Sequence, residues 1–221
     1  MIEKTSQIEH KNLSQLPPLL LKSEYLIGGC CMGVTIHYRG VVLCNEDYIS
    51  EILTQVKEML RENNVTDIKP LDGFESDEDF ERAKALVNLK PVPSWVQKGS
   101  FVYTFRPNTK QPRTPTKKKG ILADLHPACE SFEITFYELG GESVWQLPYT
   151  FVKTQFAPLS VHVLICEILK FVDSMITYKG GDFLVNDEGD YYYTRDLEKL
   201  KECFGKVDLL IGRIICALAM V

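Results

Sequence analysis

The sequence predicts an α+β protein: a mixed or antiparallel sheet with four to five helices packed mainly on one side. Segments with strand-like alternation and segments with helical spacing come in clusters, whereas a doubly wound parallel sheet would alternate them strictly. No internal repeat and no clear linker interrupts the chain. We therefore expect one domain over residues 17–221 behind a polar tail at 1–16, with a split near residue 95 as the alternative.

The first half is predicted to hold a β-rich segment followed by two helices. Residues 25–44 contain two β-rich runs, VTIHY and VVLC, arranged as a hairpin or as one bulged strand. Residues 47–64 repeat apolar side chains at helical spacing, and Asn45 before them is a residue type that caps helix N-termini. Ser76 can cap a second helix over 77–89, whose first turn is acidic.

The second half is predicted to build most of the sheet. Strands are expected at 100–105, 121–125 and 132–139, and in the segment after Gly141. Pro148 interrupts that last strand and suits a sheet edge or a bulge. Pro158 is placed at the first turn of a helix that runs to about Ile176, and a helix after Thr194 ends near Gly205.

The run Asp187-Glu188-Gly189-Asp190 is interpreted as the tip of a β-hairpin that leads into a second strand at 191–193. A type I turn followed by glycine at positive φ closes such hairpins, and only glycine takes that conformation without steric cost. We expect these acidic groups to face water, and we favour this turn over a metal site.

The composition limits the classes of function. The chain has 221 residues, a net charge of −5 and a pI near 5.5, which argues against nucleic-acid binding by the whole protein. No export signal and no run near the ~18 apolar residues of a membrane span is present, so we expect no membrane partner. The seven cysteines are odd in number and irregularly spaced, which predicts reduced thiols and a cytoplasmic location.

The segment DLHPACESFE at 124–133 is the strongest candidate for catalysis. It places His126, Cys129 and Glu130 close together, and an imidazole near a thiol can lower the thiol pKa and produce a nucleophile. The same residue types bind zinc, with further donors needed from His37, His162 or Cys44. The competing interpretation is an ordinary polar turn bent by Pro127, so no metal and no cofactor is predicted.

The position of His162 and the run of three tyrosines also lead to predictions. His162 shares a helix face with Cys166, and we expect it to be a partly buried structural residue rather than a ligand. Tyr191, Tyr192 and Tyr193 are consecutive, so in a strand at least one ring would face solvent and could mark an interface.

A basic segment at 106–119 is predicted to be a long, mobile loop. Its possible anion contacts are Arg106, Lys110, Arg113, Lys117, Lys118 and Lys119. Such an arm can contact phosphates regardless of sequence, although the negative net charge of the protein makes a nucleic-acid partner the less favoured interpretation.

The leading functional hypothesis is a cytosolic, non-catalytic binding or regulatory module, because no P-loop, GxGxxG, HExxH, CxxC or GxSxG motif is present. A hydrolase or transferase that uses residues 126–130 is the alternative, so enzyme activity is left open. A third hypothesis is an accessory nucleic-acid binder. Residues 207–221 are apolar on more than one side, which predicts a helix that forms a homodimer.

Overall fold

The computed structural model describes residues 34–94, 102–107, 112–141 and 143–206. Its centre is a six-stranded sheet with the order β2-β5-β6-β7-β1-β8, in which every paired neighbour is antiparallel. The strands are β1 (Thr35–Leu43), β2 (Ile68–Asp72), β5 (Pro115–Ala123), β6 (Phe132–Leu139), β7 (Val144–Lys153) and β8 (Asp182–Asp187). A separate hairpin pairs β3 (Leu89–Ser94) with β4 (Val102–Pro107).

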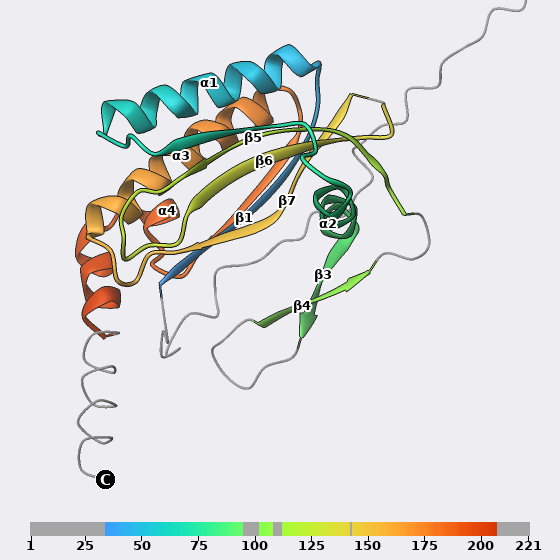
Figure 1. Ribbon diagram of the computed structural model, residues 1–221. Coiled ribbons are helices and arrows are strands. Elements are labelled where there is room, and N and C mark those ends of the chain that lie inside the picture. The colour runs from blue at the N-terminus through green and yellow to red at the C-terminus, as the bar shows by residue number, and fades with distance from the viewer. Residues whose placement is uncertain (1–33, 95–101, 108–111, 142, 207–221) are drawn as a thin grey trace, which may run out of the picture.

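The helices divide unequally between the two faces of the sheet (Figure 1). Helices α1 (Glu46–Glu62) and α3 (Leu159–Tyr178) cover one face, while α2 (Asp77–Val87) packs on the opposite face near β5 and β7. A single turn, α4 (Tyr191–Thr194), and a helical segment at 197–206 follow β8. The predicted α+β class, with helices mainly on one side of an antiparallel sheet, is confirmed.

Both predicted helix caps are confirmed. The Asn45 side chain accepts a hydrogen bond from the backbone N–H of Tyr48 at 3.1 Å, which satisfies one of the free donors at the start of α1. Ser76 does the same for the N–H of Asp79 at the start of α2. Each helix therefore begins where a short side chain close in sequence can accept a backbone hydrogen bond.

Strand alternation sends one set of side chains into the core beneath α1 and α3. The largest fully buried side chains from the strands are aromatic: Trp145, Tyr38, Phe132 and Phe136. Pro148 lies at a bulge, because the β1–β7 register shifts between Tyr38 and Gly40, where Arg39 faces both Pro148 and Tyr149. The bulge needs no N–H from the proline, as the sequence predicted.

The predicted loop over 106–119 is wrong for residues 115–119, which begin strand β5. Their backbone pairs with β6 on one side, and Lys119 also pairs with Asp72 of β2 on the other. Neighbouring strands, rather than apolar periodicity, hold this polar segment in the sheet. Such pairing cannot be inferred from local hydropathy.

The predicted second strand at 191–193 is also wrong, because these residues form α4. Asp190 adopts a left-handed conformation with φ near 60°, and Asp187 accepts a hydrogen bond from the N–H of Tyr192 at 2.8 Å. These two features turn the chain into a helical turn after β8. The tail at 1–16 and the predicted helix at 207–221 lie outside the described residues.

Among the described helices, none combines the length and the apolar character needed to cross a membrane.

Candidate functional site

The face of the sheet that points away from α1 and α3 carries a polar set of side chains. On β1, Arg39 and Val41 alternate with the core residues Tyr38 and Val42. The same alternation on β7 and β8 places Gln146, Tyr149, Phe151, Asp182 and Leu184 on this face. Phe151 and Leu184 are exposed there, so the described helices leave this part of the sheet open.

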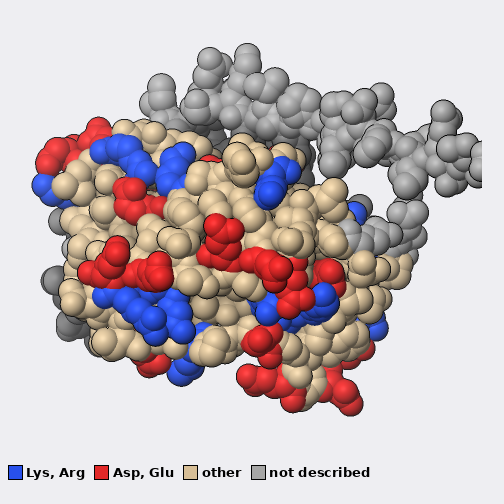
Figure 2. All heavy atoms as spheres, turned by 90° about the horizontal axis from the view of Figure 1, so that it is seen from above, with Lys and Arg blue, Asp and Glu red and all other residues tan. Residues whose placement is uncertain are grey.

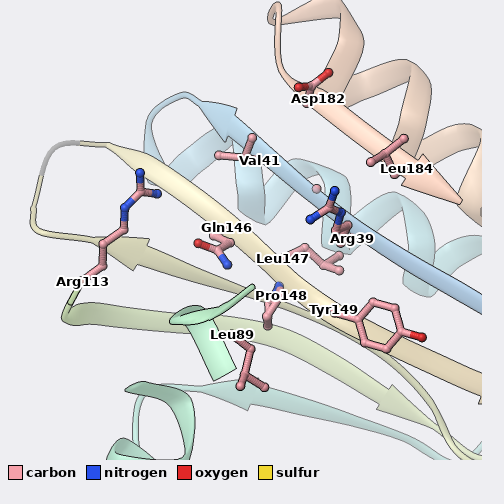
Figure 3. A pocket seen from close by; sticks show the side chains of 11 residues that line it. Arg39, Val41, Leu89, Arg113, Gln146, Leu147, Pro148, Tyr149, Asp182 and Leu184 are labelled. Carbon is pink, nitrogen blue, oxygen red and sulfur yellow. The ribbon is translucent and has the colours of Figure 1, made fainter. Parts of the chain in front are cut away.

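A cavity of about 250 Å³ lies on this open face. The strands β1, β7 and β8 form most of its lining, and Leu89 and Arg113 close one side (Figure 3). In Figure 3, Gln146 lies between the guanidinium groups of Arg39 and Arg113, and Pro148 lies beneath them. The cavity therefore brings together two cations that are 74 positions apart in the chain (113 − 39).

Neither arginine has an acidic partner within ion-pair distance among the residues that the structure describes. Asp182 also lines the cavity but forms no ion pair with either of them. The backbone of Arg113 is held by Asn88, which accepts from its N–H and donates to its carbonyl, both at 2.7 Å. Two cations on anchored backbone can therefore bind an incoming anion without first breaking an internal salt bridge.

Gln146 and Leu89 connect the cavity to α2, which packs on the same face of the sheet. The Gln146 side-chain amide donates to the carbonyl of Val87 at 3.2 Å, at the end of α2. Leu89 begins β3, only two residues later in the chain. The amide position is thus fixed by α2, and in Figure 3 its oxygen points to the side of the cavity where Arg113 lies.

A chain of polar side chains lies at the margin of the cavity. The Tyr149 hydroxyl is 2.5 Å from Nδ1 of His37, and the two rings are stacked with centroids 5.6 Å apart. On its other side, His37 Nε2 lies 3.7 Å from Glu188 Oε1. Glu188 in turn accepts from the N–H of Thr35 at 2.9 Å. This chain orients Tyr149, whose ring lines the cavity.

The side chains of His126, Cys129 and Glu130 each bond to a backbone group, and none of these hydrogen bonds joins one of the three side chains to another. His126 Nδ1 accepts from the N–H of Ala128, the Cys129 thiol donates to the carbonyl of Lys153, and Glu130 accepts from the N–H of Lys153. Burial, together with the nearby Glu130 carboxylate, raises the pKa of the Cys129 thiol to about 11. This arrangement gives no support to a thiolate nucleophile at neutral pH.

The predicted anion contacts fall into different surroundings. Lys117 and Lys119 point to the α1 side and pair with Glu46 at 2.8 and 3.1 Å, while Lys118 points to the other side and pairs with Asp79 at 2.7 Å. Arg113 lines the cavity. The side chain of Arg106, in β4, and all of Lys110 lie outside the described residues.

Figure 2 shows one face of the protein, on which lysine and arginine side chains lie next to aspartate and glutamate side chains and neither sign forms a continuous field. The ion pairs of Lys117, Lys118 and Lys119 show that carboxylates already neutralise the three lysines of β5. A sequence-independent phosphate contact through them would have to displace those partners.

The predicted solvated turn at 187–190 is wrong for Asp187, whose side chain is fully buried. Its carboxylate accepts from the N–H groups of Gly189 and Tyr192, and its Oδ1 lies 3.1 Å from Nε2 of His162. Burial alone would raise the pKa of Asp187, but His162 and these two N–H groups outweigh it and hold the pKa below its usual range. Gly189 does not have a positive φ either.

His162 is fully buried rather than partly buried, and the sequence did not indicate its partners. Its Nδ1 lies 2.8 Å from Oγ1 of Thr154, and the Cys166 thiol lies 3.8 Å from Oδ2 of Asp187. In the sequence, the only indication of this cluster was the spacing that places His162 and Cys166 on one helix face. Nothing local connects either of them with Asp187, which comes from β8.

Comparison with known protein families, with curated proteins and with solved structures gives no match. The functional argument therefore depends on the residues of this chain alone.

Proposed function

We propose that the chain is a non-catalytic binding module of the cytoplasm, and that its open sheet face binds a small anion, a phosphate or a carboxylate. One observation carries this proposal: Arg39 and Arg113 line one cavity, and neither has an acidic partner among the described residues. Guanidinium groups bind phosphate and carboxylate through paired N–H donors, which makes arginine the usual residue for such recognition.

The surroundings of the two arginines support the same ligand class. The cavity is of a size that suits a small ligand rather than a large cofactor, and apolar side chains of Leu89, Leu147 and Pro148 share its lining. A partly apolar wall lowers the local dielectric constant and so strengthens the attraction between a guanidinium group and an anion. The Gln146 amide adds a polar group that can orient the ligand, and the Tyr149 ring adds to the lining.

A binding experiment with inorganic phosphate and with acetate tests this proposal. Each anion is titrated into the full chain against sodium chloride of equal ionic strength, and the melting temperature is followed. We expect at least one of them to raise the melting temperature of the wild type by preferential binding to the folded state. The response of each anion separately distinguishes a phosphate ligand from a carboxylate ligand.

Matched variants locate the effect. Arg39→Gln and Arg113→Gln should each abolish most of the anion-dependent rise, because each removes one of the two cations. Arg61→Gln, at the last turn of α1, removes the same charge outside the cavity and should retain the rise. Equal responses in all three variants, or no response of the wild type to either anion, would show that the cavity is not the site.

Cytoplasmic location and self-association are part of the same proposal. The described cysteines Cys44, Cys129, Cys166 and Cys203 are all free, which suits a reducing compartment. The proposed homodimer uses residues 207–221, and light scattering at micromolar concentration tests it. A monomer of about 25 kDa would refute self-association and leave the anion site unaffected.

A further inference from the structure

We propose that His162, Cys166 and Asp187 form a zinc-binding site inside the domain, separate from the cavity on the open face. Single donor atoms from the three residues all lie within 4.8 Å of one another, and all three residues are buried. Two of them come from adjacent turns of α3 and the third from the end of β8, so the site would tie these two elements together.

The hydrogen bonds around His162 leave one ring nitrogen without a partner. Thr154 Oγ1 lies 3.2 Å from the carbonyl oxygen of Val34 and 2.8 Å from Nδ1 of His162, and we assign the hydroxyl as a donor to Val34 and an acceptor from Nδ1–H. In the neutral ring, this assignment places the lone pair on Nε2. Nε2 is fully buried and lies 3.1 Å from Asp187 Oδ1, yet the two atoms are not aligned for a hydrogen bond.

A lone pair next to a carboxylate oxygen is repulsive unless a proton or a cation lies between them, and the lowered pKa of Asp187 agrees with a donated proton or a positive charge being favoured at this point. Zinc-bound histidines commonly donate their other ring N–H to a neighbouring acceptor, which fixes the tautomer. Thr154 occupies that position for His162. The unpartnered Nε2 is therefore oriented as a metal ligand would be.

Asp187 can supply donors to both of the other ligands. Its Oδ1 faces His162, and its Oδ2 lies 3.8 Å from the sulfur of Cys166. A carboxylate that binds through both oxygens would thus complete four donor atoms with one nitrogen and one sulfur. This mixture of nitrogen, sulfur and oxygen suits zinc, whereas calcium and magnesium prefer oxygen ligands alone.

The backbone of Gly189 packs closely against this site and leaves no room for a side chain. A Cβ atom at that position would lie 3.2 Å from His162 Nε2, 3.1 Å from Asp187 Oδ1 and 2.5 Å from Leu200. The absent side chain would therefore press on the two ligand atoms that face each other. On binding, Zn²⁺ would replace the thiol proton of Cys166, which is released to solvent, while Nε2 donates its lone pair.

The experiment uses the full chain purified without chelators. We expect about one zinc per chain by mass spectrometry of metals, since a single site is proposed. After the zinc is removed, titration with Co²⁺ should produce a sulfur-to-cobalt charge-transfer band. Cys166→Ser should lose that band and weaken zinc binding by more than about tenfold. Cys44→Ser, which removes another buried thiol, should keep both.

Two results would overturn the proposal: a wild type that binds neither zinc nor cobalt, or a Cys166→Ser variant with an unchanged cobalt band. If Cys166→Ser fails to fold, X-ray absorption of the zinc-loaded wild type decides the question. It should show one sulfur scatterer together with nitrogen and oxygen. No sulfur, or two or more, would place the metal elsewhere.

Discussion

Two sets of histidine, cysteine and carboxylate residues differ in this protein: in one set the side chains bond to the backbone, and in the other they lie close to one another. His126, Cys129 and Glu130 are neighbours in sequence, yet each of their side chains bonds to a different backbone group. His162, Cys166 and Asp187 span 25 positions (187 − 162), yet their donor atoms lie within 4.8 Å of one another. The first set is partly exposed between two strands, and the second is enclosed between α3, β8 and the segment after it.

This difference teaches that closeness in sequence is a poor guide to closeness of side chains. In a turn, successive side chains diverge and find backbone partners or water. On one helix face, residues four apart point the same way, and a strand that packs against that face can bring a third group to them. Burial then removes competing water and makes the surviving polar contacts strong.

The largest expected effect is the loss of stability on Asp187→Ala. This change leaves the N–H groups of Gly189 and Tyr192 without their acceptor and leaves His162 without its carboxylate. We expect the free energy of unfolding to fall by about 3 kcal/mol. Urea denaturation measured with a chelator present separates this effect from metal binding.

Glu130→Ala is the matched change in the other set. Glu130 accepts a single backbone hydrogen bond at an exposed position, so its loss should cost less than about 1 kcal/mol. Equal losses in the two variants would contradict the comparison between the buried and the exposed set.

The second prediction concerns thiol reactivity. With a pKa of about 11, Cys129 should react with iodoacetamide at pH 8 roughly a hundredfold more slowly than a thiol of ordinary pKa. Its rate should rise about tenfold for each pH unit, because the thiolate fraction does so below the pKa. Peptide mass spectrometry of the timed reaction follows Cys129 alone.

Rapid labelling of Cys129 at neutral pH would reverse the argument. It would mean that His126 activates the thiol after all, and the hydrolase or transferase hypothesis would gain its first support. The urea-unfolded chain provides the control, because there Cys129 has the ordinary thiol pKa.

The third prediction uses the close packing around Gly189. Gly189→Ala should lower the free energy of unfolding by about 2 kcal/mol, because the new methyl group meets Leu200, Asp187 and His162 in a packed region. Gly205→Ala is the control, since among the described residues no atom outside its own helix lies within 4 Å of its Cβ position. It should be neutral or slightly stabilising within the helical segment at 197–206. Thermal denaturation of both variants checks the difference.

The smallest effect is expected at the Asp79–Lys118 pair, which is less enclosed than Asp187. Burial would raise the pKa of Asp79, but hydrogen bonds from Lys118 and from the N–H of Glu75 hold it below the ordinary 3.8. A depressed folded pKa means that the pair stabilises the protein above about pH 4 and loses this contribution as the pH falls through the folded pKa.

The wild type should therefore exceed Asp79→Asn in stability by about 1 kcal/mol at pH 6, and the difference should shrink at lower pH. Urea denaturation across this pH range measures it. A difference that stays constant down to pH 3 would show that the ionised carboxylate of Asp79 is not responsible.

Sequence reasoning succeeded for the elements whose determinants lie within a few residues. Asn45 and Ser76 could be identified as caps because the bond that each forms is local, to an N–H three residues later. The buried face of α1 could be predicted because it follows from the spacing of the apolar residues within that helix. An irregularity at Pro148 was predictable because proline lacks the N–H that a regular ladder needs. For the candidate sites, the sequence named Arg113 but not Arg39, since a lone arginine in a strand carries no local signal.

By itself, then, the sequence determined the α+β class, the helix starts and an irregularity at Pro148, while the pairing with β1 decided that this irregularity is a bulge and not a sheet edge. Only the tertiary structure decided that three consecutive lysines form a strand, because acidic partners on α1 and α2 and backbone partners on β6 and β2 stabilise them. It alone buried Asp187 against His162, since that contact joins α3 to β8. Long-range pairing of charges changes both the conformation and the chemistry of a residue, and no local pattern records it.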